Sequence, residues 1–211
     1  MGNVEFRRQI IHLSGVSTVP LSLIYGKFTI GVLSIILSLI ILTISEYYKR
    51  KEGIKNRLPF EIGFLEKIEN IFYDTINSFE REEYIKQHPY FGAFTFFLSI
   101  GVIFLLLPLK IACLAVTVLA VGDSSATLIG STLGKHRTPI DRSKTWEGTI
   151  GGLISSIIAC TVLSFYIEIS TNYIFIAPIV GMLAEIFSRK INDNLIIPIS
   201  IAAVLLMIEI L

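Results

Sequence analysis

The sequence predicts an all-α fold, a polytopic bundle of about seven transmembrane helices. Hydrophobic residues make up 53% of the 211 residues and charged residues only 17%, whereas about a quarter of a soluble domain is charged. Apolar stretches close to the roughly 20 residues that cross a bilayer recur along the chain. The mean hydropathy is +0.70. The bilayer is therefore the expected solvent, and residues 1–211 are predicted to form one membrane-embedded domain.

The apolar stretches give the predicted spans in chain order. The first and sixth are the weakest, because the first carries His12 and Pro20 and the sixth is short and contains Glu185. Six spans is therefore the alternative. The seven predicted spans are residues 10–26, 28–45, 91–109, 111–130, 149–167, 173–187 and 195–211.

The basic residues orient this topology. With a cytoplasmic N-terminus, sixteen of the eighteen Lys and Arg residues fall on the inner side and only Lys27 and Lys110 fall outside, as the positive-inside rule requires. The near balance of charge, +1 overall, gives no indication of nucleic-acid binding. We expect a multi-pass protein of the cell membrane, or of the endoplasmic reticulum if the source is eukaryotic.

A long loop, about residues 46–90, is predicted to be a cytoplasmic amphipathic connector. Apolar residues from Phe64 to Phe79 recur in it at helical spacing, which favours a helix on the membrane surface or against the bundle. It either covers the cytoplasmic ends of the spans or gates a lipid substrate.

One acid, Asp123, lies deep in the fourth apolar run. An unpaired charge there costs a few kcal/mol, so intramembrane carboxylates are usually functional. On a helix, Asp123, Thr127, Gly130 and Gly134 share one face. The glycines either admit a phosphate or pack against another helix, as GxxxG spacing allows.

The segment that follows has the composition of an anion site. Lys135, Arg142 and Lys144 precede a helix start at Gly148, where free backbone N–H groups and the helix dipole favour phosphate. The alternative is an ordinary positive-inside anchor. The spacing between Gly130 and Lys135 excludes a Walker A loop.

A third cluster, Asp193 and Asn194, precedes the last span. Mg²⁺ prefers oxygen ligands and usually takes one or two carboxylates plus substrate phosphates. Asp123 and Asp193 are therefore the predicted metal ligands, and a polar turn at the membrane surface is the alternative for Asp193.

These motifs together resemble a known family. GDSSATLIGSTLGKHRTP at 122–139 and KTWEGTIGG at 144–152 resemble CTP-dependent polyprenol and dolichol kinases, with phytol kinases and CTP-dependent diacylglycerol kinases as close relatives. FRRQIIHLSG at 6–15, SEYYKR at 45–50 and NDNLIIPI at 192–199 resemble further family signatures. The chain is much shorter than eukaryotic dolichol kinases and resembles a minimal prokaryotic or archaeal version.

The resemblance implies transfer of the CTP γ-phosphate to a long-chain isoprenoid alcohol, giving a polyprenyl phosphate that carries glycans. It implies CTP, the alcohol, Mg²⁺ and membrane lipids as partners and leaves a homo-oligomer open. The predicted catalytic residues are Asp123, Lys144, Glu147, His12 and Glu46, with His12 or Glu46 orienting or deprotonating the alcohol. The predicted nucleotide-binding residues are Gly122, Ser124, Thr127, Gly130, Gly134, Lys135, Arg142, Thr145, Gly148 and Asn194.

Two other functions compete with the kinase. Phosphatidate cytidylyltransferases share an acid followed by KTWEG, but their Pro-Gly-His-Gly-Gly stretch is absent here. An ion-coupled transporter using Asp123 and Glu185 is the third hypothesis. Transporters often contain internal repeats, and the two halves of this chain show no convincing repeat.

Overall fold

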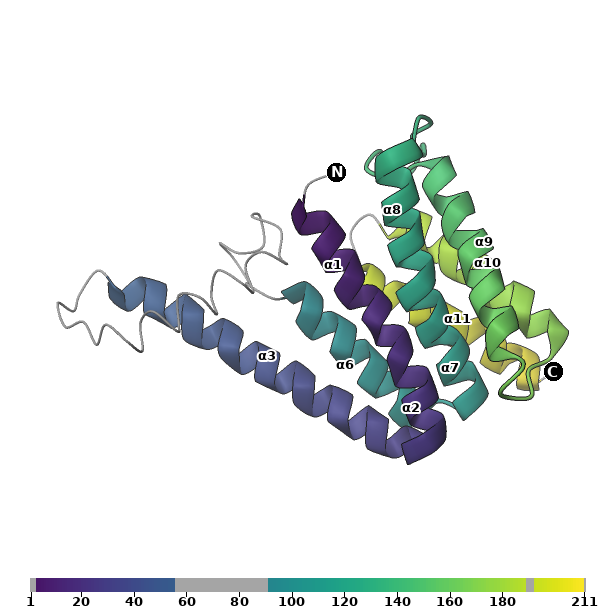
Figure 1. Ribbon diagram of the computed structural model, residues 1–211, viewed down its shortest axis with the longest axis horizontal. Helices are drawn as coiled ribbons and strands as arrows, with labels where there is room; N and C mark the ends of the chain where they lie inside the picture. The colour runs from purple at the N-terminus through teal and green to yellow at the C-terminus, as the bar shows by residue number, and fades with distance from the viewer. Residues whose placement is uncertain (1–2, 56–90, 189–191, 211) are drawn as a thin grey trace.

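The computed structural model describes residues 3–55, 91–188 and 192–210 (Figure 1). Within these ranges the regular elements are helices, and the one β-type contact is an isolated bridge between Arg137 and Thr145. The predicted all-α class is confirmed. Most of the predicted connector at 46–90, including its amphipathic stretch, lies outside the described residues.

The helical elements run as follows along the chain. They are α1 (Asn3–Ser14), the 3₁₀ turn η1 (Gly15–Ser17), α2 (Thr18–Tyr25), α3 (Lys27–Lys55), α6 (Phe91–Leu106), α7 (Leu109–Thr117), the π-helical turn η2 (Val118–Asp123), α8 (Ser124–Leu133), α9 (Trp146–Leu163), α10 (Thr171–Phe187) and α11 (Asp193–Ile210).

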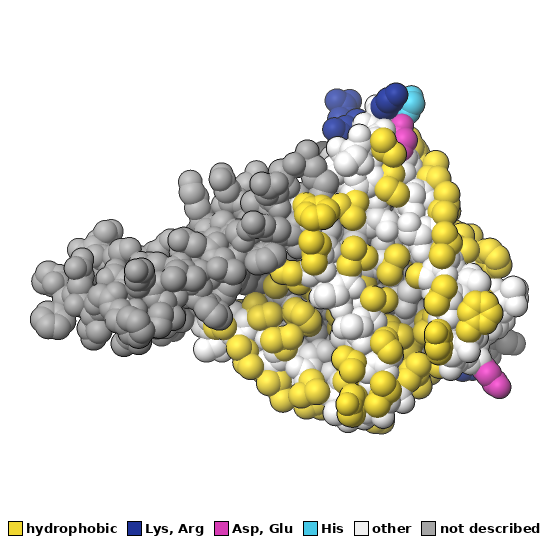
Figure 2. All heavy atoms as spheres, viewed as in Figure 1, with side chains coloured by type: hydrophobic (Ala, Val, Ile, Leu, Met, Phe, Trp, Pro, Cys, Tyr) yellow, Lys and Arg dark blue, Asp and Glu magenta, His cyan; other side chains and the backbone are white. Residues whose placement is uncertain are grey.

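Four helical stretches in the described part of the chain are long and apolar enough to cross a membrane. They are Lys27–Glu46, Leu109–Leu133, Trp146–Leu163 and Asp193–Ile210, while α6 and α10 are apolar but shorter. In Figure 2, hydrophobic side chains are spread over the described part of the visible face, and charged side chains lie at its upper and lower right edges. The chain is thus a membrane protein. The count of seven spans and the orientation of the N-terminus stay predictions.

A turn joins α2 to α3 at one end of the bundle. Gly26 has φ +86°, a conformation that side chains disfavour, and it reverses the chain there. Lys27 Nζ donates a hydrogen bond of 2.6 Å to the carbonyl of Leu107, just before α7. This contact holds together the two turns that precede α3 and α7.

The continuous stretch α7–η2–α8 forms the centre of the fold. Residues 111–120 are almost completely buried, and η2 packs against α9, α10 and α11. Gly122 permits this approach, because a Cβ there would lie 2.5 Å from Ser156 Oγ. The π-helical turn ends at Asp123. Turns of this kind occur often at functional sites.

Helices α8 and α9 lie side by side (Figure 1) and touch through glycines. A Cβ on Gly148 would lie 2.6 Å from the carbonyl oxygen of Ala126 and 3.0 Å from Gly130 Cα. A Cβ on Gly134 would lie 2.6 Å from Thr145. The structure therefore places these glycines in a close helix–helix contact, the packing role that small residues allow.

Candidate functional site

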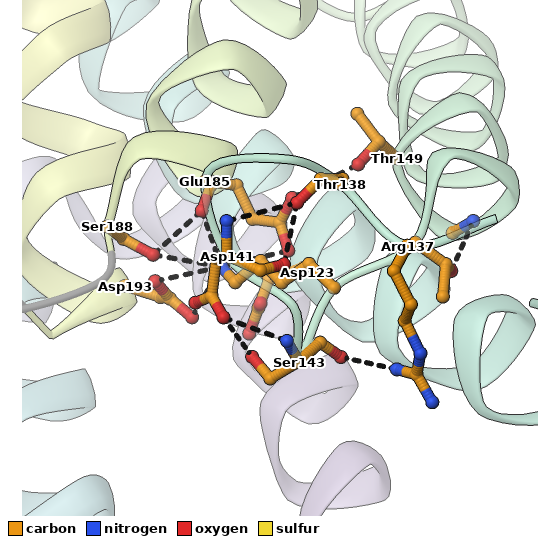
Figure 3. Close-up of polar contacts among 12 residues, drawn as sticks. Asp123, Arg137, Thr138, Asp141, Ser143, Thr149, Glu185, Ser188 and Asp193 are labelled. Carbon is orange, nitrogen blue, oxygen red and sulfur yellow. Dashed lines mark hydrogen bonds and ion pairs between the residues drawn. The ribbon is translucent and has the colours of Figure 1, made fainter.

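A largely buried lysine stands at the centre of the site. Lys144 Nζ lies 3.0 Å from Glu185 Oε1 and 3.1 Å from Asp193 Oδ2, and it donates to Ser188 Oγ at 2.9 Å. It also donates to the backbone carbonyl of Glu185. Figure 3 shows Glu185, Ser188 and Asp193 grouped beside Asp123. The lysine thus ties the start of α9 to the end of α10 and the start of α11.

These carboxylates keep Lys144 charged. Burial opposes the charge, but Asp193 and Glu185 outweigh it, so the pKa of the Lys144 ammonium is raised above its ordinary value. Asp123 adds to the effect. The site therefore holds a permanent cation near neutral pH.

The loop that carries Lys144 is folded back on itself. The Thr138 N–H donates to the carbonyl of Lys144 at 3.0 Å, and the Trp146 N–H donates to that of His136 at 2.9 Å. Thr138 Oγ1 donates to the carbonyl of Asp141 at 2.6 Å. These bonds fix the backbone on both sides of Lys144, so its side chain is held inside the bundle.

Asp123 meets a residue from the other end of the chain. His12 Nδ1 lies 3.5 Å from Asp123 Oδ2, and both side chains are more than nine-tenths buried. Helix α1 packs against η2 and α8, which brings the two together. Asp123, Lys144, His12 and Asp193, all predicted from the sequence, therefore come together in the structure.

Two predicted residues at the start of α9 serve local structure. Thr145 is the N-cap, and its Oγ1 accepts from the Gly148 N–H at 3.2 Å. Glu147 accepts from the His136 backbone N–H and pairs with the His136 ring at 2.6 Å. The structure thus points Glu147 toward the exposed loop, and its predicted catalytic role stays a prediction.

The other predicted residues lie around this cluster in different settings. Lys135 and Arg142 are exposed on the loop, Thr127 is half-buried, and Gly122, Gly130, Gly134 and Gly148 line helix contacts. Ser124 is buried and donates weakly, at 3.5 Å, to the carbonyl of Gln9. Asn194 Nδ2 donates to the carbonyl of Gly92 at 3.1 Å, which attaches α11 to α6.

Glu46 is not brought into the cluster. It is exposed on α3, which packs against α6 and α2 and lies at the opposite edge of the bundle from α9 (Figure 1). In contrast, Glu185 and Ser188 contact Lys144 directly but were absent from the predicted site. The sequence feature that could have identified Glu185 is an acidic residue within an apolar helix. The same feature identified Asp123.

Asp123 and Asp193 stay the predicted magnesium ligands of the cluster. Asp123, Glu185 and Asp193 all interact electrostatically with Lys144, and carboxylates are the hard oxygen ligands that Mg²⁺ prefers. Within the described ranges, no group of three or more His, Cys, Asp or Glu side chains is arranged to hold a metal by itself. The donor set therefore suits a cation that takes one or two carboxylates and completes its shell with substrate oxygens.

Comparison with known proteins assigns the family. The profile of the cytidylyltransferase family matches residues 30–189, a range that contains Asp123, Lys144 and Glu185. The chain belongs to the cytidylyltransferase family. A phytol kinase from Synechocystis sp. strain PCC 6803 is 33% identical over 131 residues, which are 58% of this chain and 56% of that protein. The chain thus matches only a little over half of this relative's length.

These matches confirm the predicted relationship to the polyprenol kinase group, in which phytol kinases are close relatives. No solved structure matches the chain. His12 and Asp193 lie outside the range matched by the cytidylyltransferase family. Their place in the site therefore depends on their contacts with Asp123 and Lys144.

Proposed function

We propose that the protein is a CTP-dependent lipid-alcohol kinase that phosphorylates a long isoprenoid alcohol, of the polyprenol or dolichol type, at the cytoplasmic membrane face. The observation that carries this proposal is the cluster of Asp123, Glu185 and Asp193 around Lys144. The similarity to a phytol kinase, an enzyme named for a lipid alcohol, supports the kinase reaction. The product is a polyprenyl phosphate that carries glycans.

The cluster suits phosphoryl transfer because this reaction depends on positioning and on neutralising phosphate charge. Asp123 and Asp193 would hold Mg²⁺, which supplies positive charge to the phosphate oxygens when bound. Lys144 adds a fixed cation. Lys135 and Arg142, exposed on the same loop, would reach the outer phosphates of CTP.

The proposed step is a displacement at the γ-phosphorus. The alcohol oxygen forms a bond to that phosphorus, the bond to the oxygen that bridges the β- and γ-phosphorus atoms breaks, and CDP leaves with the electron pair. The hydroxyl proton passes to a base. Of the two residues predicted to orient or deprotonate the alcohol, His12 lies beside Asp123, whereas Glu46 lies on the far helix α3.

A cytidylyltransferase that makes a CDP-lipid is the second candidate, and the match to the cytidylyltransferase family favours it. The two reactions differ in the phosphorus that is attacked. Incubating the purified protein with CTP, Mg²⁺ and a panel of lipid alcohols and lipid phosphates separates them. A kinase releases CDP and a phosphorylated alcohol, and a cytidylyltransferase releases pyrophosphate.

A substitution of Lys144 tests the site itself. Lys144→Ala removes a cation that water cannot replace, so we expect kcat/KM for CTP to fall about 100-fold. Ser143→Ala, a neighbouring exposed position, is the matched control. If KM and kcat were unchanged in Lys144→Ala, the loop would serve only as a positive-inside anchor and would have no role in CTP binding or transfer.

A further inference from the structure

The imidazole of His12 packs against a buried aromatic ring. It stacks on Phe96 of α6, with ring centroids 4.4 Å apart and the planes inclined by 29°. Phe96 is completely buried, and His12 is 6% exposed. The imidazole is therefore packed against the buried Phe96 ring.

Gly15 makes this stacking possible. It lies one turn after His12, and a Cβ there would be 2.4 Å from Phe96 Cζ and 3.4 Å from Ile100 Cδ1. Only a residue without a side chain lets Phe96 reach beneath the imidazole. Segments about 80 residues apart in the sequence thus fix a single ring.

The held ring leaves one polar atom without a hydrogen bond. His12 Nδ1 is buried and has no hydrogen-bond partner among the described residues. Its neighbour Asp123 Oδ2, at 3.5 Å, forms an ion-pair contact but is beyond ordinary hydrogen-bond length. A buried polar atom without a partner is unfavourable, and at a proposed active site it indicates a missing ligand atom.

We propose that His12 Nδ1 and Asp123 Oδ2 together bind the hydroxyl of the lipid acceptor. A hydroxyl group can donate one hydrogen bond and accept another at the same time. Its oxygen would accept a hydrogen bond from His12 Nδ1–H, and its O–H would donate a hydrogen bond to Asp123 Oδ2. A carboxylate ligand would be repelled by Asp123. This inference rests on the proposed kinase function for its reaction, but the binding itself is testable without turnover.

The test compares an isoprenoid alcohol with its methyl ether, which lacks the donated proton. Binding is measured by competition with a diazirine-bearing isoprenoid alcohol that cross-links to the purified protein in nanodiscs, without CTP. Wild type should prefer the alcohol over the ether by about tenfold, the value of one good buried hydrogen bond. Equal affinity for alcohol and ether in wild type would overturn the proposal.

Two substitutions locate the contact. Asn places a polar atom where Nδ1 stands, and Gln places one where Nε2 stands. We expect His12→Asn to keep most of the preference for the alcohol and His12→Gln to lose it. Ser14→Ala, on the exposed side of the same helix, should match wild type. Equal behaviour of the Asn and Gln variants would refute the assignment to Nδ1.

Two further readouts separate this inference from other causes. Binding of CTP with Mg²⁺, measured on the same samples, should be within about threefold of wild type in His12→Gln, because the proposed bond is made only to the alcohol. If CTP binding falls in parallel with alcohol binding, His12 positions Asp123 instead and the proposal is wrong. Gly15→Ala, which keeps the imidazole but displaces Phe96, should lower alcohol affinity alone. The product assay on wild type tests the kinase function separately.

Discussion

Removal of the central cation should destabilise the protein, and removal of one of its partners should then restore part of the loss. Lys144→Met keeps most of the side-chain volume but deletes the charge. The Lys144 and Glu185 side chains are only 14% and 6% exposed, so the change leaves a buried carboxylate without its ion pair. Breaking such a pair from one side costs about 3–5 kcal/mol.

The double variant Lys144→Met/Glu185→Gln tests that reasoning. Because the introduced glutamine carries no charge, most of the penalty for an unpaired buried charge disappears, and we expect about 1–3 kcal/mol of the loss to be recovered. Thermal unfolding of the purified proteins, followed by the helical circular dichroism signal, measures both steps. A double variant no more stable than Lys144→Met would contradict the buried ion pair.

The pH dependence gives a second check on the same pair. The pKa of Lys144 is raised in the folded protein, so its contribution to stability is complete below the unfolded value of about 10.4 and is lost only as the pH rises through the folded pKa. The stability difference between wild type and Lys144→Met should therefore not shrink between pH 7 and 9. A difference that shrinks by pH 9 would show that the lysine is not held as a cation.

Three further predictions concern the metal, the helix contact and the topology. Asp123→Asn should lower turnover at least about 100-fold in an intact protein. If this variant kept wild-type activity at limiting Mg²⁺, a metal role for Asp123 would be excluded. Gly148→Ala meets backbone and should cost about 1–3 kcal/mol, whereas Gly151→Ala meets the movable end of an isoleucine side chain and should cost less in the same unfolding assay. Glu46→Cys and Arg142→Cys should be labelled from the same side of sealed, oriented vesicles, and labelling from opposite sides would refute the predicted topology.

The two acids within apolar helices differ in how much of their role the local sequence predicts. Asp123 was identified because a charge within an apolar run is expensive wherever the chain folds, so its importance shows in the local sequence. Glu185 carried the same local signal. What the sequence did not indicate was that Lys144, 41 residues earlier, would bond to it.

Local motifs also carry more than one meaning. The glycines at 130, 134 and 148 suit either phosphate approach or helix contact, and the structure places them between α8 and α9. Glu147, predicted as catalytic from its motif, pairs with His136 across its own loop. Sequence spacing alone does not separate these roles, because the same small or charged side chain serves both.

The sequence by itself determined the membrane character, the all-α class, the family and the identity of Asp123, Lys144, Asp193 and His12 as candidates. Each of these follows from composition or from residues close together in the chain. Only the tertiary structure decided that Glu185 joins Lys144, that Glu46 lies apart, and that Phe96 and Gly15 hold His12 against Asp123. Such contacts join helices far apart in sequence, and their geometry is set by how all the helices pack together.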